Sequence, residues 1–191
     1  MQNNSGVITW GRTTGQASGI LLNKKEAVTL KKINPKHIEQ VIELHNKGPF
    51  IELLSMKIVD LGMGSSLIET VIENKHMNPF GIMHGGVYAT LLDTATYWSA
   101  YCEMDEDVGY TTTGIKIDYL GMLKAGKISV EGRSIKVGKS IALAEATAKD
   151  ADGKILAHAT SNLLVLGTRQ SINQAIKAMG GSALPPKFIN E

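Results

Sequence analysis

The chain has 191 residues, of which 43% are hydrophobic and 20% charged. This length and composition suit one domain with a real core and extra segments at its ends. A formal net charge of +2 gives no bulk attraction to nucleic acid, and the lone Cys102 excludes an intramolecular disulfide and a cysteine-based zinc cluster. The chain shows no secretory signal and its apolar runs are too short to span a membrane, so we expect a soluble cytoplasmic protein with no membrane partner.

The N-terminal quarter of the chain predicts one helix. Residues 1–23 are rich in Gly, Ser, Thr and Asn and show no period, which is typical of a loose arm or an irregular cap. Asn34 followed by Pro35 predicts a helix start, and an apolar stripe continues to about Lys47. We therefore expect residues 1–47 to form an N-terminal extension with an amphipathic helix.

The middle of the chain predicts a long helix after two strand-like segments. Residues 50–59 suit a strand, or a short helix followed by a strand, and residues 66–73 suit a second strand. A helical pattern opens after Gly86, and at 100° per residue one arc collects the apolar residues. The members of this arc are Val87, Tyr88, Leu91, Leu92, Ala95 and Trp98. Asp93 lies on the opposite arc with Ala89, Thr96 and Tyr97, where small residues favour contact with a partner.

The second half predicts an antiparallel meander. Its strand-like segments are 110–120, 127–137, 140–150 and 154–166, and the breaks between them fit hairpin turns such as Asp152-Gly153. One long helix followed by such a meander predicts an α+β fold with a sheet wrapped on a central helix. We expect the main domain to span residues 48–167, and residues 168–191 to form a C-terminal tail with a short helix at 171–179.

One motif at the start of the long helix carries chemistry. Asn78 is followed by His84-Gly85-Gly86 and then, one helix face away, by Asp93. Backbone N–H groups at a helix N-terminus form an electropositive cradle, and two glycines let a ligand approach that backbone. A carbonyl polariser beside a carboxylate base is what acyl hydrolysis requires. A capping histidine, a tight turn and a solvated aspartate are the alternative interpretations of the same residues.

The spacing of this motif resembles that of the hotdog-fold acyl-CoA thioesterases of the phenylacetate-degradation (PaaI-like) type. The resemblance continues through Thr111-Thr112-Thr113, Ile117-Asp118-Tyr119-Leu120 and Gly138-Lys139-Ser140, and covers about residues 50 to 166. It implies a hotdog fold, an acyl-CoA substrate, no metal or redox cofactor, and a homodimer or homotetramer.

The resemblance also implies roles for individual residues. Asp93 would be the general base or the nucleophile, acting across a dimer interface, and Asn78 would orient water or the thioester. His84 would shape the pocket and hold its loop, and Gly85 or Gly86 would polarise the carbonyl. Thr112 matches a hydroxyl position that could hold the attacking water, although Thr111 and Thr113 lie close enough to compete for it.

The turn Gly138-Lys139-Ser140 would lie near the coenzyme A phosphates, because a lysine and free amides suit phosphate. The chain departs from the family after Leu120, where Gly121-Met122 replaces a frequent Arg-Pro. This change removes a cation that could help bind the nucleotide, and Lys124 is a possible replacement.

Two alternative functions remain on the same fold. A non-catalytic acyl-CoA-binding or sensing module is compatible with the N-terminal extension, although the retained Asp93 argues against it. A hotdog dehydratase ranks last, because the chain has no Asp-(four residues)-His segment. The histidines show no recognisable metal-ligand spacing, and Cys102 is best explained as a small core residue.

Overall fold

The computed structural model of the protein describes residues 32–178 and 181–189. The elements in chain order are β1 (Lys32–Ile33), α1 (Pro35–Asn46), α2 (Pro49–Leu53), β2 (Lys57–Gly62), β3 (Ser65–Ile72), the 3-10 helix η1 (Asn74–His76), α3 (Gly85–Tyr101), β4 (Gly109–Tyr119), β5 (Gly126–Val137), β6 (Ile141–Asp150), β7 (Ile155–Gly167), α4 (Ile172–Ala178) and β8 (Phe188–Ile189). The arm predicted at residues 1–23 lies outside the described residues. Of the two alternatives for residues 50–59, a short helix followed by a strand is the one observed.

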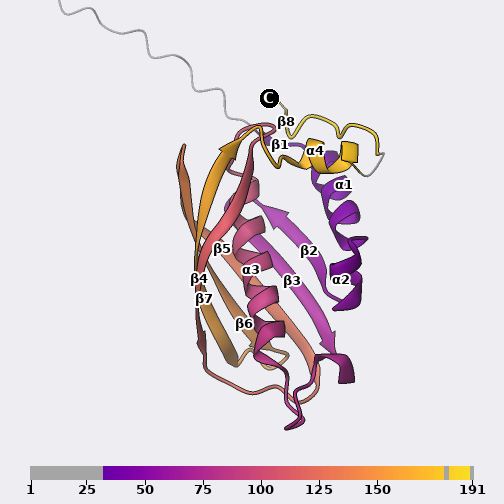
Figure 1. Cartoon of the computed structure of the whole chain (residues 1–191), viewed down its shortest axis with the longest axis vertical. Coiled ribbons are helices and arrows are strands. Elements are labelled where there is room, and N and C mark those ends of the chain that lie inside the picture. The colour runs from indigo at the N-terminus through magenta and orange to yellow at the C-terminus, as the bar shows by residue number, and fades with distance from the viewer. Residues whose placement is uncertain (1–31, 179–180, 190–191) are drawn as a thin grey trace, which may run out of the picture.

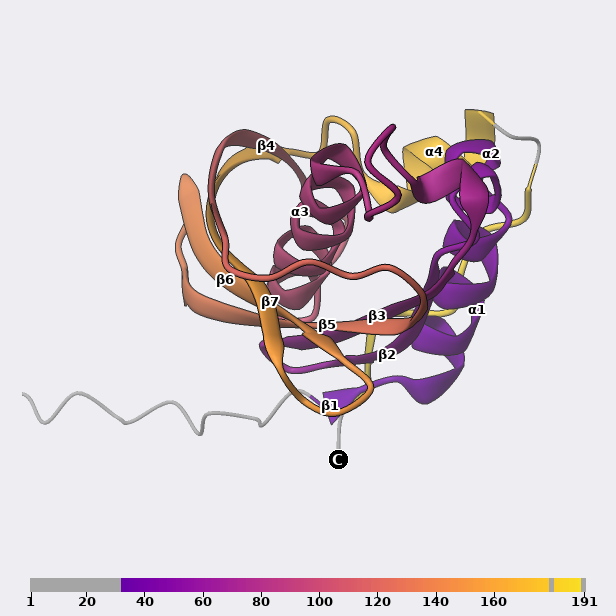
Figure 2. The same cartoon turned by 90° about the horizontal axis from the view of Figure 1, so that it is seen from below.

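A six-stranded antiparallel sheet, in the order β2-β3-β5-β6-β7-β4, wraps around α3 (Figures 1 and 2). The predicted α+β hotdog architecture is therefore confirmed. The predicted four-stranded meander is only partly correct, because β4 pairs with β7 at the edge of the sheet, so the connection from β4 to β5 is a crossover and not a hairpin turn. All six residues of the predicted apolar arc of α3 are buried. One detail differs from the expectation: Thr96, placed on the arc facing a partner, is fully buried within this chain. The sheet curls around the helix and so covers more of its circumference than a flat sheet would.

The helix backbone touches the sheet at Gly132 of β5. A Cβ atom on this glycine would lie 2.2 Å from the carbonyl oxygen of Ala95 and 2.4 Å from the hydroxyl of Ser66. The Ser66 hydroxyl donates a 2.7 Å hydrogen bond to the same carbonyl oxygen. Glycine at this position therefore allows the backbone of α3 to pack directly on β5. The Ser66 hydrogen bond holds the helix at this short distance from the sheet.

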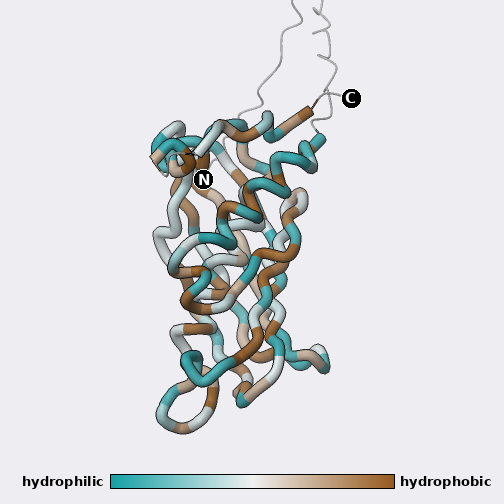
Figure 3. Tube along the Cα trace, turned by 90° about the vertical axis from the view of Figure 1, so that its right-hand side faces the viewer, coloured by the Kyte–Doolittle hydropathy of each residue, from teal (hydrophilic) through white to brown (hydrophobic). Residues whose placement is uncertain are grey.

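Helix α1 closes the β2 edge of the sheet. The Asn34 side chain caps its first turn and Pro35 occupies its first position, as the sequence predicts. At its last residue, Asn46, the side-chain amide donates to the carbonyl oxygen of Ile58 (3.0 Å) and accepts from the Ile58 N–H (2.8 Å). This amide takes the bonds that a further strand would make with β2. Figure 3, viewed from the α1 side, shows hydrophilic and hydrophobic residues interleaved along this face.

The C-terminal segment returns to the start of the described chain, where β8 pairs with β1. The buried Lys187 ammonium donates to the Met104 carbonyl oxygen (2.9 Å) and lies 4.0 Å from the centre of the Tyr101 ring. The Tyr101 hydroxyl also meets the His37 Nε2 atom at 2.6 Å. Burial lowers the pKa of His37, and the Lys187 charge lowers it further. The division into an extension, a main domain and a tail remains a prediction. The β1–β8 pairing joins the predicted extension to the predicted tail.

None of the helices within residues 32–178 and 181–189 combines the length and apolarity that crossing a bilayer requires.

Candidate active site

Helix α3 begins at Gly85, with His84 as its N-cap. The His84 Nδ1 atom accepts a 2.8 Å hydrogen bond from the Gly86 N–H, so the capping interpretation of this histidine is confirmed. The Gly85 N–H, in contrast, makes no hydrogen bond within the part of the chain that the structure describes. Of the two glycine amides, Gly85 is therefore the one that remains available to polarise a carbonyl.

The loop before the helix is fixed from both sides. The Asn78 side-chain oxygen accepts from the Phe80 N–H (2.9 Å), and the Met83 N–H donates to the Leu123 carbonyl oxygen (2.8 Å). Asn78 thus shapes its own turn through its oxygen. Its side-chain NH₂ group makes no hydrogen bond to any described residue, and so it keeps its donors for another acceptor.

His76, which has no role in the sequence prediction, supports this loop. It is fully buried, and its backbone carbonyl oxygen accepts from the His84 N–H at 2.8 Å. Its Nδ1 atom accepts from the Glu73 N–H (2.9 Å), while its Nε2 atom meets the Leu54 carbonyl oxygen (2.8 Å). No signal in the sequence distinguishes His76 from a surface histidine, because its partners come from the turn before it and from the segment after α2.

Asp93 lies two turns along α3 and is bound by Thr112. The Thr112 hydroxyl donates a 2.9 Å hydrogen bond to Asp93 Oδ1. The strand register explains the choice among the three threonines: Thr112 pairs with the buried Leu163 and faces the helix, whereas Thr111 pairs with the exposed Leu164. Asp93 is partly buried and has no ion-pair partner among the described residues. Its second oxygen is thus free to accept from water.

Two tyrosines bound the C-terminal side of Asp93. Tyr97, one turn further along α3, stacks on the buried Tyr110 with ring centres 4.1 Å apart. Burial, together with the smaller effect of the Asp93 charge, raises the pKa of Tyr97 to about 12. Tyr97 therefore stays protonated beside the carboxylate and does not compete with it as a base.

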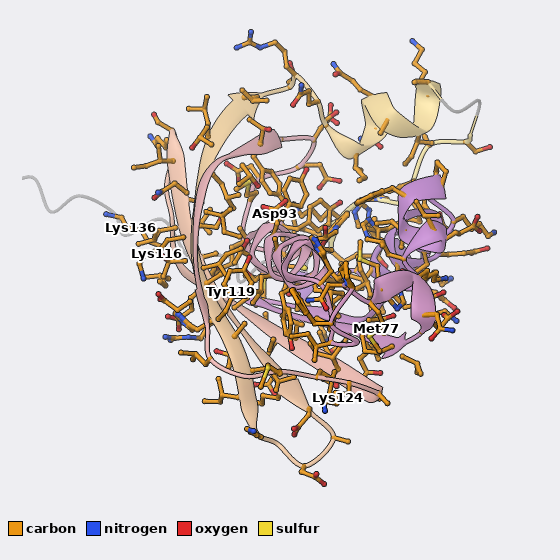
Figure 4. All side chains as sticks on the ribbon, turned by 60° about the horizontal axis from the view of Figure 1, so that its bottom comes forward. Met77, Asp93, Lys116, Tyr119, Lys124 and Lys136 are labelled. Atoms are coloured by element: carbon orange, nitrogen blue, oxygen red, sulfur yellow. The ribbon has the colours of Figure 1, made fainter. Side chains whose placement is uncertain are left out.

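Tyr119, at the end of β4, contacts the glycine pair and was not assigned a role from sequence. Its hydroxyl donates to the Gly85 carbonyl oxygen at 3.3 Å, and its ring lies 3.6 Å from where a Cβ atom on Gly85 would be. Figure 4 shows Tyr119 and Asp93 both beside the α3 coil, whereas Lys116 and Lys136 project from the outer side of the sheet. Only the tyrosine-leucine pair in the family motif signalled this position.

The predicted phosphate-binding turn lies elsewhere. Gly138 and Lys139 line a cavity of about 430 Å³ together with Glu103, which follows the C-terminal end of α3. Within one chain this turn and the Gly85 amide therefore lie at opposite ends of the helix. Lys124, by contrast, directly follows Leu123, whose carbonyl oxygen binds the Met83 N–H of the glycine loop.

A larger cavity of about 910 Å³, between α1, α2 and the β2–β3 strands, contains none of the predicted site residues.

Cys102 lies in the core, as the sequence predicts. Cys102 is fully buried, and burial raises the pKa of its thiol to about 11. No cluster of His, Cys, Asp and Glu able to hold a metal ion occurs among residues 32–178 and 181–189.

The fold has known counterparts, and part of the sequence matches a known family. Residues 80–157 match the family model described as the thioesterase superfamily. The human acyl-coenzyme A thioesterase 13 is 28% identical over 124 residues, which cover 63% of this chain and 88% of that protein. A thioesterase from Haemophilus influenzae has the same fold with a TM-score of 0.64 at 20% identity, covering 69% of this chain and 92% of that one. A variant of the phenylacetic acid degradation protein PaaI from Thermus thermophilus gives 0.56 at 21% identity, covering 61% and 98%.

Proposed function

We propose that this protein, a hotdog member of the thioesterase superfamily, hydrolyses an acyl-CoA thioester to the free acid and CoA. The observation that carries the proposal is the Asp93–Thr112 hydrogen bond on the same helix that presents an unoccupied Gly85 amide. A carboxylate held by one oxygen can accept a proton from water with the other. A free helix N-terminal amide can stabilise the oxyanion that the water attack creates.

The proposed chemistry uses three residues directly. Asp93 removes a proton from water, the hydroxide attacks the thioester carbonyl, and Gly85 N–H and the Asn78 amide stabilise the oxyanion. The tetrahedral intermediate collapses by breaking the C–S bond, and the CoA thiolate leaves and takes up a proton. Thr112 holds the carboxylate in place throughout. The nucleophilic alternative, in which Asp93 attacks the carbonyl itself, uses the same residues.

The helix geometry argues for a site shared between two chains. Eight residues separate Gly85 from Asp93, which corresponds to about 12 Å along the axis of an α-helix. The Gly85 amide points out of the helix end, whereas Asp93 is held sideways against β4 by Thr112. We infer that the amide of one copy and the carboxylate of a second copy act on one carbonyl, in a homodimer that can pair into a tetramer.

Two substitutions at Gly85 test whether its N–H group stabilises the oxyanion. Proline is favoured at the first helical position, and the preceding His84 has the extended backbone (φ −66°, ψ 137°) that proline requires before it. Gly85→Pro deletes the N–H, and we expect it to lower kcat by about 10²–10³-fold. Gly85→Ala keeps the N–H, and its methyl group meets no atom of the chain closer than 3.6 Å, so it is the matched control.

The assay is release of free thiol from short, medium, long and aryl acyl-CoAs. We expect hydrolysis of at least one of them, and a loss of about 10²–10⁴-fold in Asp93→Asn. A folded Asp93→Asn protein with wild-type turnover would rule out Asp93 as the base. Failure of the whole panel would favour the binding or sensing module, which retained CoA affinity in calorimetry would then identify.

Mixed dimers test the shared site. Asp93→Asn and Gly85→Pro chains are unfolded together and refolded, so that half of the dimers carry one intact site. Activity should return to about a quarter of wild type under random pairing, although each parent is inactive. Gly85 is preferable to Gly86 for this experiment, because a Cβ atom on Gly86 would lie 3.0 Å from the His84 Nδ1 atom and disturb the cap.

A further inference from the structure

We propose that Tyr119 is a positioning residue that fixes the Gly85–Gly86 peptide group, and thereby the Gly85 Cα, at which the preceding peptide group with the Gly85 N–H is attached. This inference rests on the proposed function of the same site. The carbonyl oxygen of Gly85 and the N–H of Gly86 belong to one planar peptide group. The Tyr119 hydroxyl donates to that oxygen, and His84 Nδ1 accepts from that N–H. The peptide group is therefore held at both of its polar ends.

The backbone of the glycine pair needs contacts from other elements to restrict its conformation. Glycine has more backbone freedom than any other residue, and Gly85 and Gly86 have no side chain with which to pack the first turn of α3. The Tyr119 ring covers the side of Gly85 where a side chain would begin, at 3.6 Å. Tyrosine thus supplies from β4 the contact that the helix residue itself cannot make.

Tyr119 is in turn fixed by its neighbours. Its ring stands edge-on to that of the buried Tyr88, with ring centres 6.1 Å apart and planes at 80°. The Tyr88 hydroxyl donates to the Gly121 carbonyl oxygen at 3.4 Å, which ties this ring to the segment after β4. Although Tyr119 is held in this way, 55% of it is exposed.

Because Tyr119 is half exposed, its positioning role can be tested without a large effect on stability. Tyr119→Phe removes one hydroxyl from a half-exposed ring and opens no cavity, so we expect an unchanged melting temperature. Loss of the hydrogen bond should lower kcat by about 2- to 10-fold with little change in KM. The control is Tyr88→Phe, which removes a hydroxyl from the same pair of rings without touching the peptide group and should leave kcat within about 2-fold. Wild-type kcat in Tyr119→Phe would overturn the proposal.

Mixed dimers assign Tyr119 to one half of the shared site. Tyr119→Ala co-refolded with Asp93→Asn should regain about a quarter of wild-type activity, because the mixed dimer holds one intact site. Tyr119→Ala co-refolded with Gly85→Pro should show no activity beyond that of Tyr119→Ala sites, since both changes affect the amide half. The reverse pattern would contradict the proposal.

Hydrogen exchange gives a readout that does not depend on activity. We expect the Gly86 amide to exchange faster in Tyr119→Phe than in wild type, because the Gly85 carbonyl oxygen then keeps only its bond within α3 and loses the one from outside the helix. Unchanged exchange at Gly86 would overturn the positioning role even in a protein that hydrolyses acyl-CoA. Faster exchange in a protein that hydrolyses no acyl-CoA would support the hold on the peptide and count only against the proposed function.

Discussion

Gly132→Ala tests how α3 is seated on the sheet. The added methyl carbon would start 2.2 Å from the Ala95 carbonyl oxygen and 2.4 Å from the Ser66 hydroxyl. Because both neighbours are buried and one is helix backbone, α3 must move away by about 1 Å, and overpacking of this kind costs about 1–3 kcal/mol. The move also breaks the 2.7 Å Ser66–Ala95 hydrogen bond, and a buried hydroxyl without a partner costs about 1–3 kcal/mol more.

The expected loss is therefore about 2–6 kcal/mol of unfolding free energy, or a decrease in Tm of roughly 5–20 °C for a chain of this size. Thermal and urea denaturation followed by circular dichroism measure both quantities. The control is Gly114→Ala in β4, where a Cβ atom would meet nothing within 4 Å. A Gly132→Ala protein with a Tm within about 2 °C of the Gly114→Ala control would refute the direct seating of the helix on the sheet.

Two further predictions concern the Asp93 carboxylate and the partly buried His45. Thr112→Val removes the hydrogen bond to Asp93, and thiol-release kinetics should show kcat reduced by about 10- to 100-fold, since bonds to charged groups contribute about 1.5–3 kcal/mol; Thr111→Val, on the outer face, should leave kcat unchanged. Burial beside Trp98 lowers the pKa of His45 from 6.5 to about 4, so below pH 6.5 the unfolded chain binds more protons than the folded one. Unfolding free energy from urea titrations should therefore fall by up to about 3 kcal/mol between pH 7 and pH 4, and a His45→Leu protein that shows the same decrease would contradict this.

The sequence predicts elements whose signals are local. The turn at Asp152-Gly153 is an example, because its glycine adopts a φ of +81° that other residues rarely adopt. The helix period correctly places Leu91 and Leu92 in the core. The same period cannot show how far a curled sheet extends around the helix, and for this reason Thr96 was expected at a partner surface.

At the candidate site, too, only the local features can be predicted from the sequence. The spacing from His84 to Asp93 is a local property of one helix, so the cap and the isolated carboxylate are visible in the sequence. The choice of Thr112 over its neighbours depends on a strand register with a bulge between Thr112 and Gly114, which no local pattern specifies. The position of Lys139 at the far end of α3 likewise depends on how β5 runs along the helix.

The Asn46 amide on β2 limits how the sheet can grow. A sheet has two edges, and here one of them is already occupied by a side chain that takes both hydrogen bonds of Ile58. The other edge, β4, pairs only with β7 among the described strands. If two copies join edge to edge through β4, the combined sheet ends at both sides in a β2 strand capped by α1. Pairing of this kind would terminate at two chains, because each outer edge would then be a β2 strand on which Asn46 already occupies the Ile58 hydrogen-bonding groups.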